Sequence, residues 1–288
     1  MAAWLVAAAP AYAADRAIVS DPTAANVSAH NGQLVWSRLA RDGRAKLVGQ
    51  IRGKTRDLPV RAKTGGVFDP DLGTNPNGQA VIVYTRCAGV SGRNCDVYEF
   101  NRATRRERRV PGASSDACSE FAPSVWIGAI VFGRSGSTEC NGVYLLRRGN
   151  LRKLDTRVPA QTDIRGSGVA YLYIPPNDVE RTFIRVRSLY RGKSRILVTG
   201  FAAEGESYRV TNPVMFGRYT HWLQQDRVRN EFFAGRGLSA RRAPLQFSDR
   251  LFPGAVDSLA VTRTGLYYTN GQGLFEATDP PPTFAARD

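Results

Sequence analysis

Five carboxylates recur near the start of short apolar segments: Asp69, Asp71, Glu120, Asp163 and Asp257. A pair of carboxylates can act as general acid and base on a glycoside, and carboxylate oxygens can also bind Ca²⁺. The same side chains could instead accept hydrogen bonds from turn N–H groups and neutralise nearby arginines such as Arg86 and Arg134. We interpret each of these acids as structural, because no catalytic motif surrounds it.

The sequence also lacks the residues that other kinds of catalysis and cofactor binding require. The only two histidines are His30, expected in a turn, and His221, expected on a strand face. They form no HExxH motif and no metal-ligand set. Gly166-Ser-Gly168 precedes a strand, so it is not the nucleophile elbow of a hydrolase, and no phosphate-binding loop is present. We expect no metal and no cofactor.

Four cysteines indicate an oxidising compartment. Neighbouring partners close loops most easily, so we predict the disulfides Cys87–Cys95 and Cys118–Cys140 out of three possible connectivities. A four-cysteine zinc site is the weaker alternative, because the sequence contains no CxxC pair.

The N-terminus also indicates export. Residues 1–13 are small and apolar and end in Ala11-Tyr-Ala13, which is the pattern of a signal peptide, although the usual positive charge is missing. A frayed apolar terminus is the alternative. No later segment is long and apolar enough to be an integral membrane segment. We expect a protein that is secreted, or held in the periplasm or cell envelope.

The charge is strongly basic, with 40 basic and 25 acidic residues and a net charge of +15. Export would separate the protein from nucleic acid, so the expected partner is an envelope protein or an acidic polymer. We expect a monomer.

The elements that position these residues follow a repeat. A turn glycine followed by alternating apolar residues and an aromatic recurs six times, roughly every 47 residues, at Gly32, Gly78, Gly128, Gly168, Gly217 and Gly265. Each motif strand has short strands before and after it, and no segment has helical periodicity. With 288 residues, 42% of them hydrophobic, the chain can bury a substantial core. The sequence predicts an all-β, six-bladed β-propeller of four-stranded antiparallel blades.

The ends of the chain predict how the ring closes. Triple proline at 280–282 prevents a last strand, while residues 16–20 form a strand without a local partner. We predict that this N-terminal strand completes the sixth blade. A single domain would then span residues 14–279, followed by a flexible tail at 280–288. A linear array or two β-sandwiches are the alternatives.

Two segments carry a family resemblance. Asn75-Pro-Asn-Gly78 before a strand ending in Tyr84, followed by Asp96-Val-Tyr-Glu-Phe-Asn101, resembles the repeat of TolB-type (WD40-like, PD40) propellers. Asn77 stands where that repeat has Asp. Residues 119–126, with Pro123 before the apolar strand, are a second partial match, and the resemblance covers residues 68–146. The chain is also similar to secreted actinobacterial propellers. The resemblance implies a propeller fold and a binding role, but it does not imply any one particular reaction.

A propeller brings its innermost strands to one axis. The five acids would then meet Arg86 and Arg134 at the mouth of a central channel, which is a polar binding site. The aromatic residues of the motif should be core. We therefore expect an exported, non-enzymatic binding or scaffolding module. The alternatives are a propeller-fold glycoside hydrolase or lyase that uses the channel-mouth carboxylates, and a propeller separated from a larger peptidase or sensor.

Overall fold

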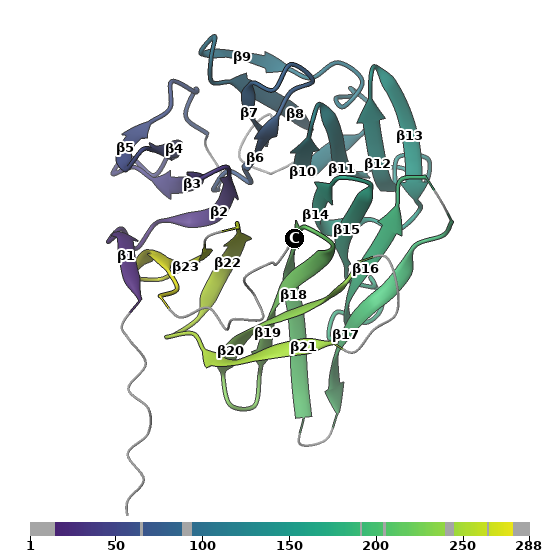
Figure 1. Ribbon diagram of the computed structural model, residues 1–288. Coiled ribbons are helices and arrows are strands. Elements are labelled where there is room, and N and C mark those ends of the chain that lie inside the picture. Colours follow the sequence, from purple (N-terminus) through teal and green to yellow (C-terminus); the bar gives the residue numbers. More distant parts are fainter. Residues whose placement is uncertain are drawn as a thin grey trace, which may run out of the picture.

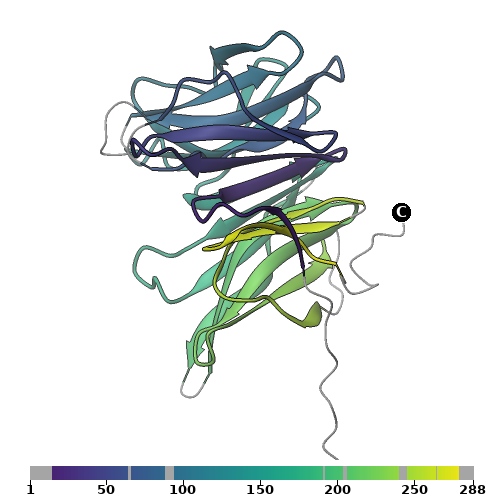
Figure 2. The same ribbon diagram turned by 90° about the vertical axis from the view of Figure 1, so that its left-hand side faces the viewer.

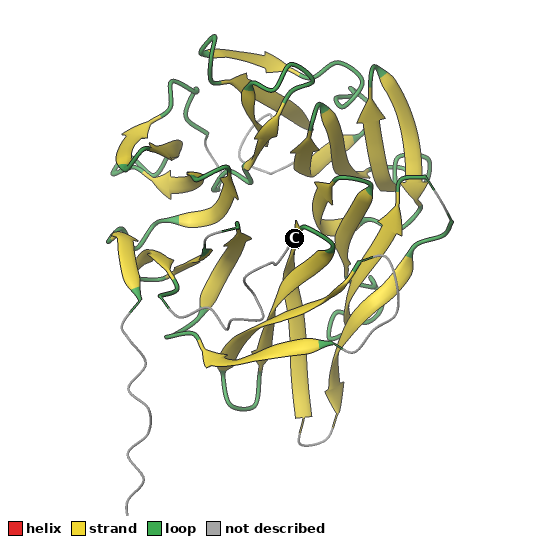
Figure 3. Cartoon of the chain, in the orientation of Figure 1, coloured by secondary structure: helices red, strands yellow, loops and turns green. Residues whose placement is uncertain are grey.

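The computed structural model describes residues 15–63, 66–87, 94–190, 192–203, 206–239, 245–263 and 265–278. In these ranges the chain forms strands and no helix (Figure 3), so the predicted all-β class is confirmed. Consequently, the described part contains no helix able to cross a membrane. The predicted signal peptide (1–13) and tail (280–288) lie outside the described residues.

Four antiparallel sheets contain four strands each, arranged around a common centre (Figure 1). The first contains β2 (Ala25–His30), β3 (Gln33–Leu39), β4 (Ala45–Ile51) and β5 (Lys54–Asp57). The second contains β6 (Asp71–Thr74), β7 (Ala80–Cys87), β8 (Cys95–Asn101) and β9 (Arg106–Arg109). The third contains β10 (Ser119–Trp126), β11 (Ala129–Ser135), β12 (Gly142–Arg147) and β13 (Asn150–Asp155). The last contains β22 (Val256–Val261), β23 (Leu266–Asn270), β24 (Gly273–Glu276) and β1 (Arg16–Val19).

A fifth sheet differs from the prediction of separate four-stranded blades, because it has eight strands. It contains β14 (Pro159–Arg165), β15 (Gly168–Tyr173), β16 (Thr182–Ser188), β17 (Arg195–Ala203), β18 (Glu206–Phe216), β19 (Tyr219–Asp226), β20 (Glu231–Leu238) and β21 (Gln246–Leu251). Strand β17 continues beyond its pairing with β16 and then pairs with the start of β18, where Phe201 lies opposite Tyr208. The rings of these two residues are 5.8 Å apart. Two long strands thus join what would otherwise be two sheets.

The N-terminal strand pairs with the last strand of the chain, as predicted. Arg16, Ala17 and Val19 of β1 lie opposite Glu276, Phe275 and Leu274 of β24. Figure 2 shows the N-terminal and C-terminal sheets side by side. A Cβ on Gly273, whose φ is +151°, would lie 2.1 Å from the carbonyl oxygen of Val19. Only glycine therefore permits this close approach.

Apolar side chains fill the spaces between successive sheets. The motif aromatics are fully buried, as predicted, and each packs in a cluster with a residue of the four strands that precede its own group; for Trp222 those strands belong to the same eight-stranded sheet. The pairs are Tyr84 with Leu47, Phe132 with Val83, Tyr171 with Val131, Trp222 with Leu172, Tyr268 with Leu223, and Trp36 with Ala260. The last pair places the first sheet against the final one.

The strands nearest the centre, here called the inner strands, are β2, β6, β10, β14, β18 and β22 (Figure 1). Each contacts the next in chain order, and β22 contacts β2. The pairing of β2, β10 and β18 is interrupted by bulges, at which Asn26, Ala122 and Asn212 have φ values of 53°, 46° and 51°. A bulge removes N–H groups from the sheet ladder, and these groups need other acceptors.

Both predicted disulfides are present. Cys87 at the end of β7 is joined to Cys95 at the start of β8, across residues that pair directly in the sheet. Cys118 precedes β10 and is joined to Cys140 before β12, with their Cα atoms 5.7 Å apart. Each disulfide therefore links segments of a single sheet.

Candidate functional site

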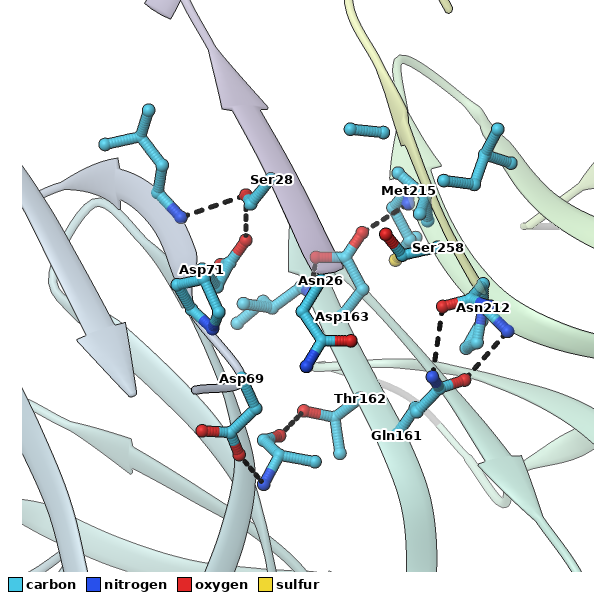
Figure 4. A pocket seen from close by; sticks show the side chains of 18 of the residues that line it. Asn26, Ser28, Asp69, Asp71, Gln161, Thr162, Asp163, Asn212, Met215 and Ser258 are labelled. Atoms are coloured by element: carbon cyan, nitrogen blue, oxygen red, sulfur yellow. Dashed lines mark hydrogen bonds between the residues drawn. The ribbon is translucent and has the colours of Figure 1, made fainter. Parts of the chain in front are cut away.

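A cavity of about 350 Å³ lies where the inner strands converge, and every one of these strands contributes to its wall. Figure 4 shows the polar side chains that surround it. A concave site with few convergent polar groups is the usual form of a ligand site. This cavity is therefore the candidate functional site.

Three of the predicted acids line the cavity: Asp69, Asp71 and Asp163. Asp69 accepts hydrogen bonds from the amide of Thr85 at 2.7 Å and from the amide of Ala122 at 3.0 Å. Asp71 accepts hydrogen bonds from the Ser28 hydroxyl at 2.8 Å and from the amide of Val125 at 2.7 Å. Both oxygens of Asp71 are thus engaged by neighbouring strands.

Asp163 lies on β14, two inner strands beyond Asp71, and both of its oxygens are also engaged. Its Oδ1 accepts a hydrogen bond from the amide of Ile164 at 2.7 Å, and its Oδ2 accepts one from the amide of Met215. Val125 and Met215 both follow a bulge in their inner strand. The acids therefore satisfy amide groups that lie beside irregular parts of the ladder.

Together these contacts join each inner strand to the next. The linking residues come from successive strands and the donor is written first: Ser28 to Asp71, Val125 to Asp71, Thr162 to the Ala122 carbonyl, Met215 to Asp163, Asn212 to the Asp257 carbonyl, and the Val27 amide to Ser258. The last bond, at 2.9 Å, connects β2 with β22. The circuit of hydrogen bonds therefore returns to its starting strand.

The carboxyl groups of Asp71 and Asp163 influence each other electrostatically. Desolvation by the surrounding protein raises the pKa of Asp71 to about 6, although its hydrogen bonds and Arg165 oppose this shift. Desolvation, followed by the negative charge of Asp71, raises the pKa of Asp163 well above its ordinary value. Two carboxyl groups that share a low-dielectric site resist being ionised together.

The opposite end of the inner strands is aromatic and basic. The Arg165 guanidinium carbon lies 4.6 Å from the centre of the Trp126 ring and 4.4 Å from that of Phe216, so the cation lies against both π faces. His30 contacts Trp126 edge-on, with ring centres 5.6 Å apart. Burial, reinforced by the charge of Arg165, lowers the pKa of His30. This end therefore presents one cation, an imidazole whose protonation is disfavoured and a half-buried indole.

The other four predicted site residues lie outside the cavity lining. Glu120 is fully buried and accepts a hydrogen bond from Arg134 Nε at 2.8 Å, because the two residues are directly paired on β10 and β11. Burial raises the pKa of Glu120 to about 7. Arg86 binds Glu107 at 2.8 Å at the outer part of its sheet. Asp257 is exposed, and it contributes its backbone carbonyl to the circuit.

The sequence interpretation missed the aromatic and basic end. His30, predicted in a turn, is the last residue of β2, and its side chain is buried in the cavity wall. His30, Trp126, Arg165 and Phe216 each stand one or two residues before a glycine of a turn. That position ends an inner strand, so it could have identified these residues. No cluster of three His, Cys, Asp or Glu suited to a metal occurs in the described ranges.

Solved structures of similar fold are distant in sequence. SapL1 lectin in complex with alpha methyl fucoside is 10% identical, over 90% of this chain and 94% of that one, with a TM-score of 0.57. A lectin of Aleuria aurantia with a six-bladed β-propeller fold is 9% identical, over 88% and 90%, with a TM-score of 0.49. A puromycin-hydrolyzing peptidase of Mycobacterium tuberculosis is 11% identical over 89% of this chain, with a TM-score of 0.49.

This chain spans only 46% of the peptidase, which is about half its length. No protein-family model and no curated protein matches the chain. The likeness to SapL1 lectin shows a shared fold, and sheets arranged around a common centre, with inner strands that contact one another in chain order, are the arrangement of a β-propeller.

Proposed function

We propose that this protein is an exported, non-enzymatic β-propeller that binds a ligand or partner of the cell envelope or extracellular space at its central cavity. It is a monomer with one domain over residues 14–279, and it has six blades. Strands β14–β17 and β18–β21 form two of these blades within the eight-stranded sheet. Strand β1 closes the ring.

Three observations support six blades and closure. The inner strands contact one another in chain order and return from β22 to β2. The hydrogen-bond circuit closes through Val27 and Ser258. Trp36 of the first sheet also packs with Ala260 of the last.

Export is supported by the disulfides, which persist in oxidising compartments, and by the signal-like residues 1–13. The TolB-type resemblance over residues 68–146 is the remaining support for a binding role in the envelope. The protein also has a net charge of +15, and this positive charge would attract it to acidic polymers of the envelope.

The non-enzymatic assignment rests on the hydrogen bonds that the cavity carboxylates already accept. A general acid or base needs a carboxyl oxygen directed at the reacting atom. In Asp71 and Asp163, all four oxygens accept hydrogen bonds from neighbouring residues. These acids hold the sheets together, so ligand contact falls to the end formed by His30, Trp126 and Arg165.

A propeller-fold glycoside hydrolase or lyase is the second candidate. It is favoured by one observation, namely that two carboxyl groups with raised pKa share the cavity. Their raised pKa values let them retain a proton to a higher pH than an ordinary carboxyl group does, as acid catalysis requires.

The test is a glycan array, chosen because SapL1 is complexed with a fucoside, combined with product analysis on the same glycans. We expect binding without turnover. Trp126→Ala should abolish this binding, whereas Tyr190→Ala, which removes an exposed aromatic from outside the cavity, should not. Turnover that Asp71→Asn abolishes would overturn the assignment in favour of an enzyme. Binding that survives Trp126→Ala would place the ligand elsewhere.

A further inference from the structure

A second hollow, of about 320 Å³, lies between the first and second sheets, away from the central cavity. Its wall contains Leu58 and Phe100, which are almost completely buried. Around these apolar side chains stand Arg56, Arg102 and Arg105. We call it the arginine pocket.

Within the residues that the structure describes, no carboxylate neutralises the three arginines. None of them forms an ion pair with any carboxylate in the described part of the chain. Asp57 lies in the wall, but it is engaged by Arg38 at 2.7 Å and by Lys46 at 3.2 Å. The pocket therefore has a net positive charge.

Arg102 is held in place before any ligand arrives. Its amide donates to the carbonyl of Ala80 at 3.1 Å, and its guanidinium donates to the Gln33 side chain. Burial, reinforced by the charge of Arg56, lowers the pKa of Arg102. Two cations held close together beside apolar surface repel each other, and an anion placed between them would remove this repulsion.

We propose that the arginine pocket binds a tetrahedral oxyanion, a phosphate or sulfate group carried by an acidic polymer or glycan. Guanidinium groups match the oxygens of such anions with paired N–H donors. The pocket volume admits a charged group together with its carrier sugar. The half-buried Arg102 acts as the fixed donor, while Arg56 and Arg105 reach the anion from the exposed edges.

Isothermal titration calorimetry of the full chain with inorganic phosphate, and separately with sulfate, tests this proposal at constant ionic strength. A short polyphosphate and a sulfated disaccharide then distinguish the two carriers. We expect Arg56→Gln and Arg102→Gln each to weaken phosphate or sulfate binding by about tenfold or more, which is the contribution of one charged hydrogen bond. Arg209→Gln removes the same charge from an exposed position of β18 outside the pocket.

This control variant should change the affinity by less than about twofold, because a distant surface charge is screened by salt. Arg102→Lys should retain the charge and still weaken binding, since lysine lacks the paired donors. Arg56 is exposed on β5, so Arg56→Gln remains a valid test even where Arg102→Gln fails to fold. The proposal is wrong if Arg56→Gln binds both anions as tightly as the unmodified chain, or if Arg209→Gln weakens binding equally.

Discussion

Gly273→Ala should detach β1 from β24. The new Cβ would lie 2.1 Å from the carbonyl oxygen of Val19, and the φ of +151° at this position disfavours any side chain. Because the clash is with backbone, β1 itself must move. Gly271→Ala is the matched control, since it lies in the same hairpin and nothing lies within 4 Å of its Cβ.

The expected loss follows from what β1 contributes. Half-buried Ile18 and Val19 pack against the cluster of the first and last sheets. Burial of each side chain stabilises the folded protein by about 1 kcal/mol. The three residue pairs with β24 add about 1 kcal/mol per hydrogen bond. The hydroxyl of buried Tyr268 donates to Asp15 at 2.5 Å, and losing this partner costs about 1–3 kcal/mol.

We therefore expect Gly273→Ala to lower the free energy of unfolding by about 5–8 kcal/mol, and Gly271→Ala by less than about 0.5 kcal/mol. Urea denaturation followed by tryptophan fluorescence and circular dichroism measures both variants. Deleting residues 14–20 should produce at least the loss of Gly273→Ala. Equal unfolding midpoints for the two glycine variants and for the truncated chain would refute the closure by β1.

Three further predictions concern the core, a disulfide and pH. Trp36→Ala should lower the free energy of unfolding by about 3–5 kcal/mol, measured by urea denaturation, while ligand binding at the cavity persists in the folded fraction. Replacing Cys118 and Cys140 by Ala should cost about 2–4 kcal/mol by the same measurement, because the unfolded chain loses a cross-link. Folding raises the pKa of Asp71, so ionisation of this group destabilises the folded protein as the pH increases from about 4 to 6. The free energy of unfolding of Asp71→Asn, measured relative to that of the unmodified chain, should therefore increase over this range. A difference in stability that stays constant between pH 4.5 and 7.5 would contradict that reasoning.

Features that depend on one sheet could be predicted from the sequence. The motif strands, their buried aromatics and the two disulfides follow from alternation and from short loops. Edge strand β5, with the sequence Lys-Thr-Arg-Asp and every residue exposed, has no apolar pattern and was not predicted. The joining of β17 to β18 also has no local signal, since it depends on how far each strand extends.

The candidate site was predicted only in part, because it combines residues from different sheets. Asp71 and Asp163 both lie on inner strands, and both line the cavity. Glu120 lies on an inner strand too, but its position opposite Arg134 directs it into its own sheet. The direction of a side chain at a bulge depends on the local twist of the strand, which composition does not reveal.

The eight-stranded sheet makes one boundary of the ring unlike the others. Elsewhere, neighbouring sheets meet through side chains and single polar contacts, so each sheet can open without breaking the ladder of the next. Between β17 and β18 the main-chain ladder itself crosses the boundary. We therefore expect strands β14 to β21 to behave as a single cooperative unit in hydrogen exchange, with amide protons on both sides of that boundary exchanging through a common opening event.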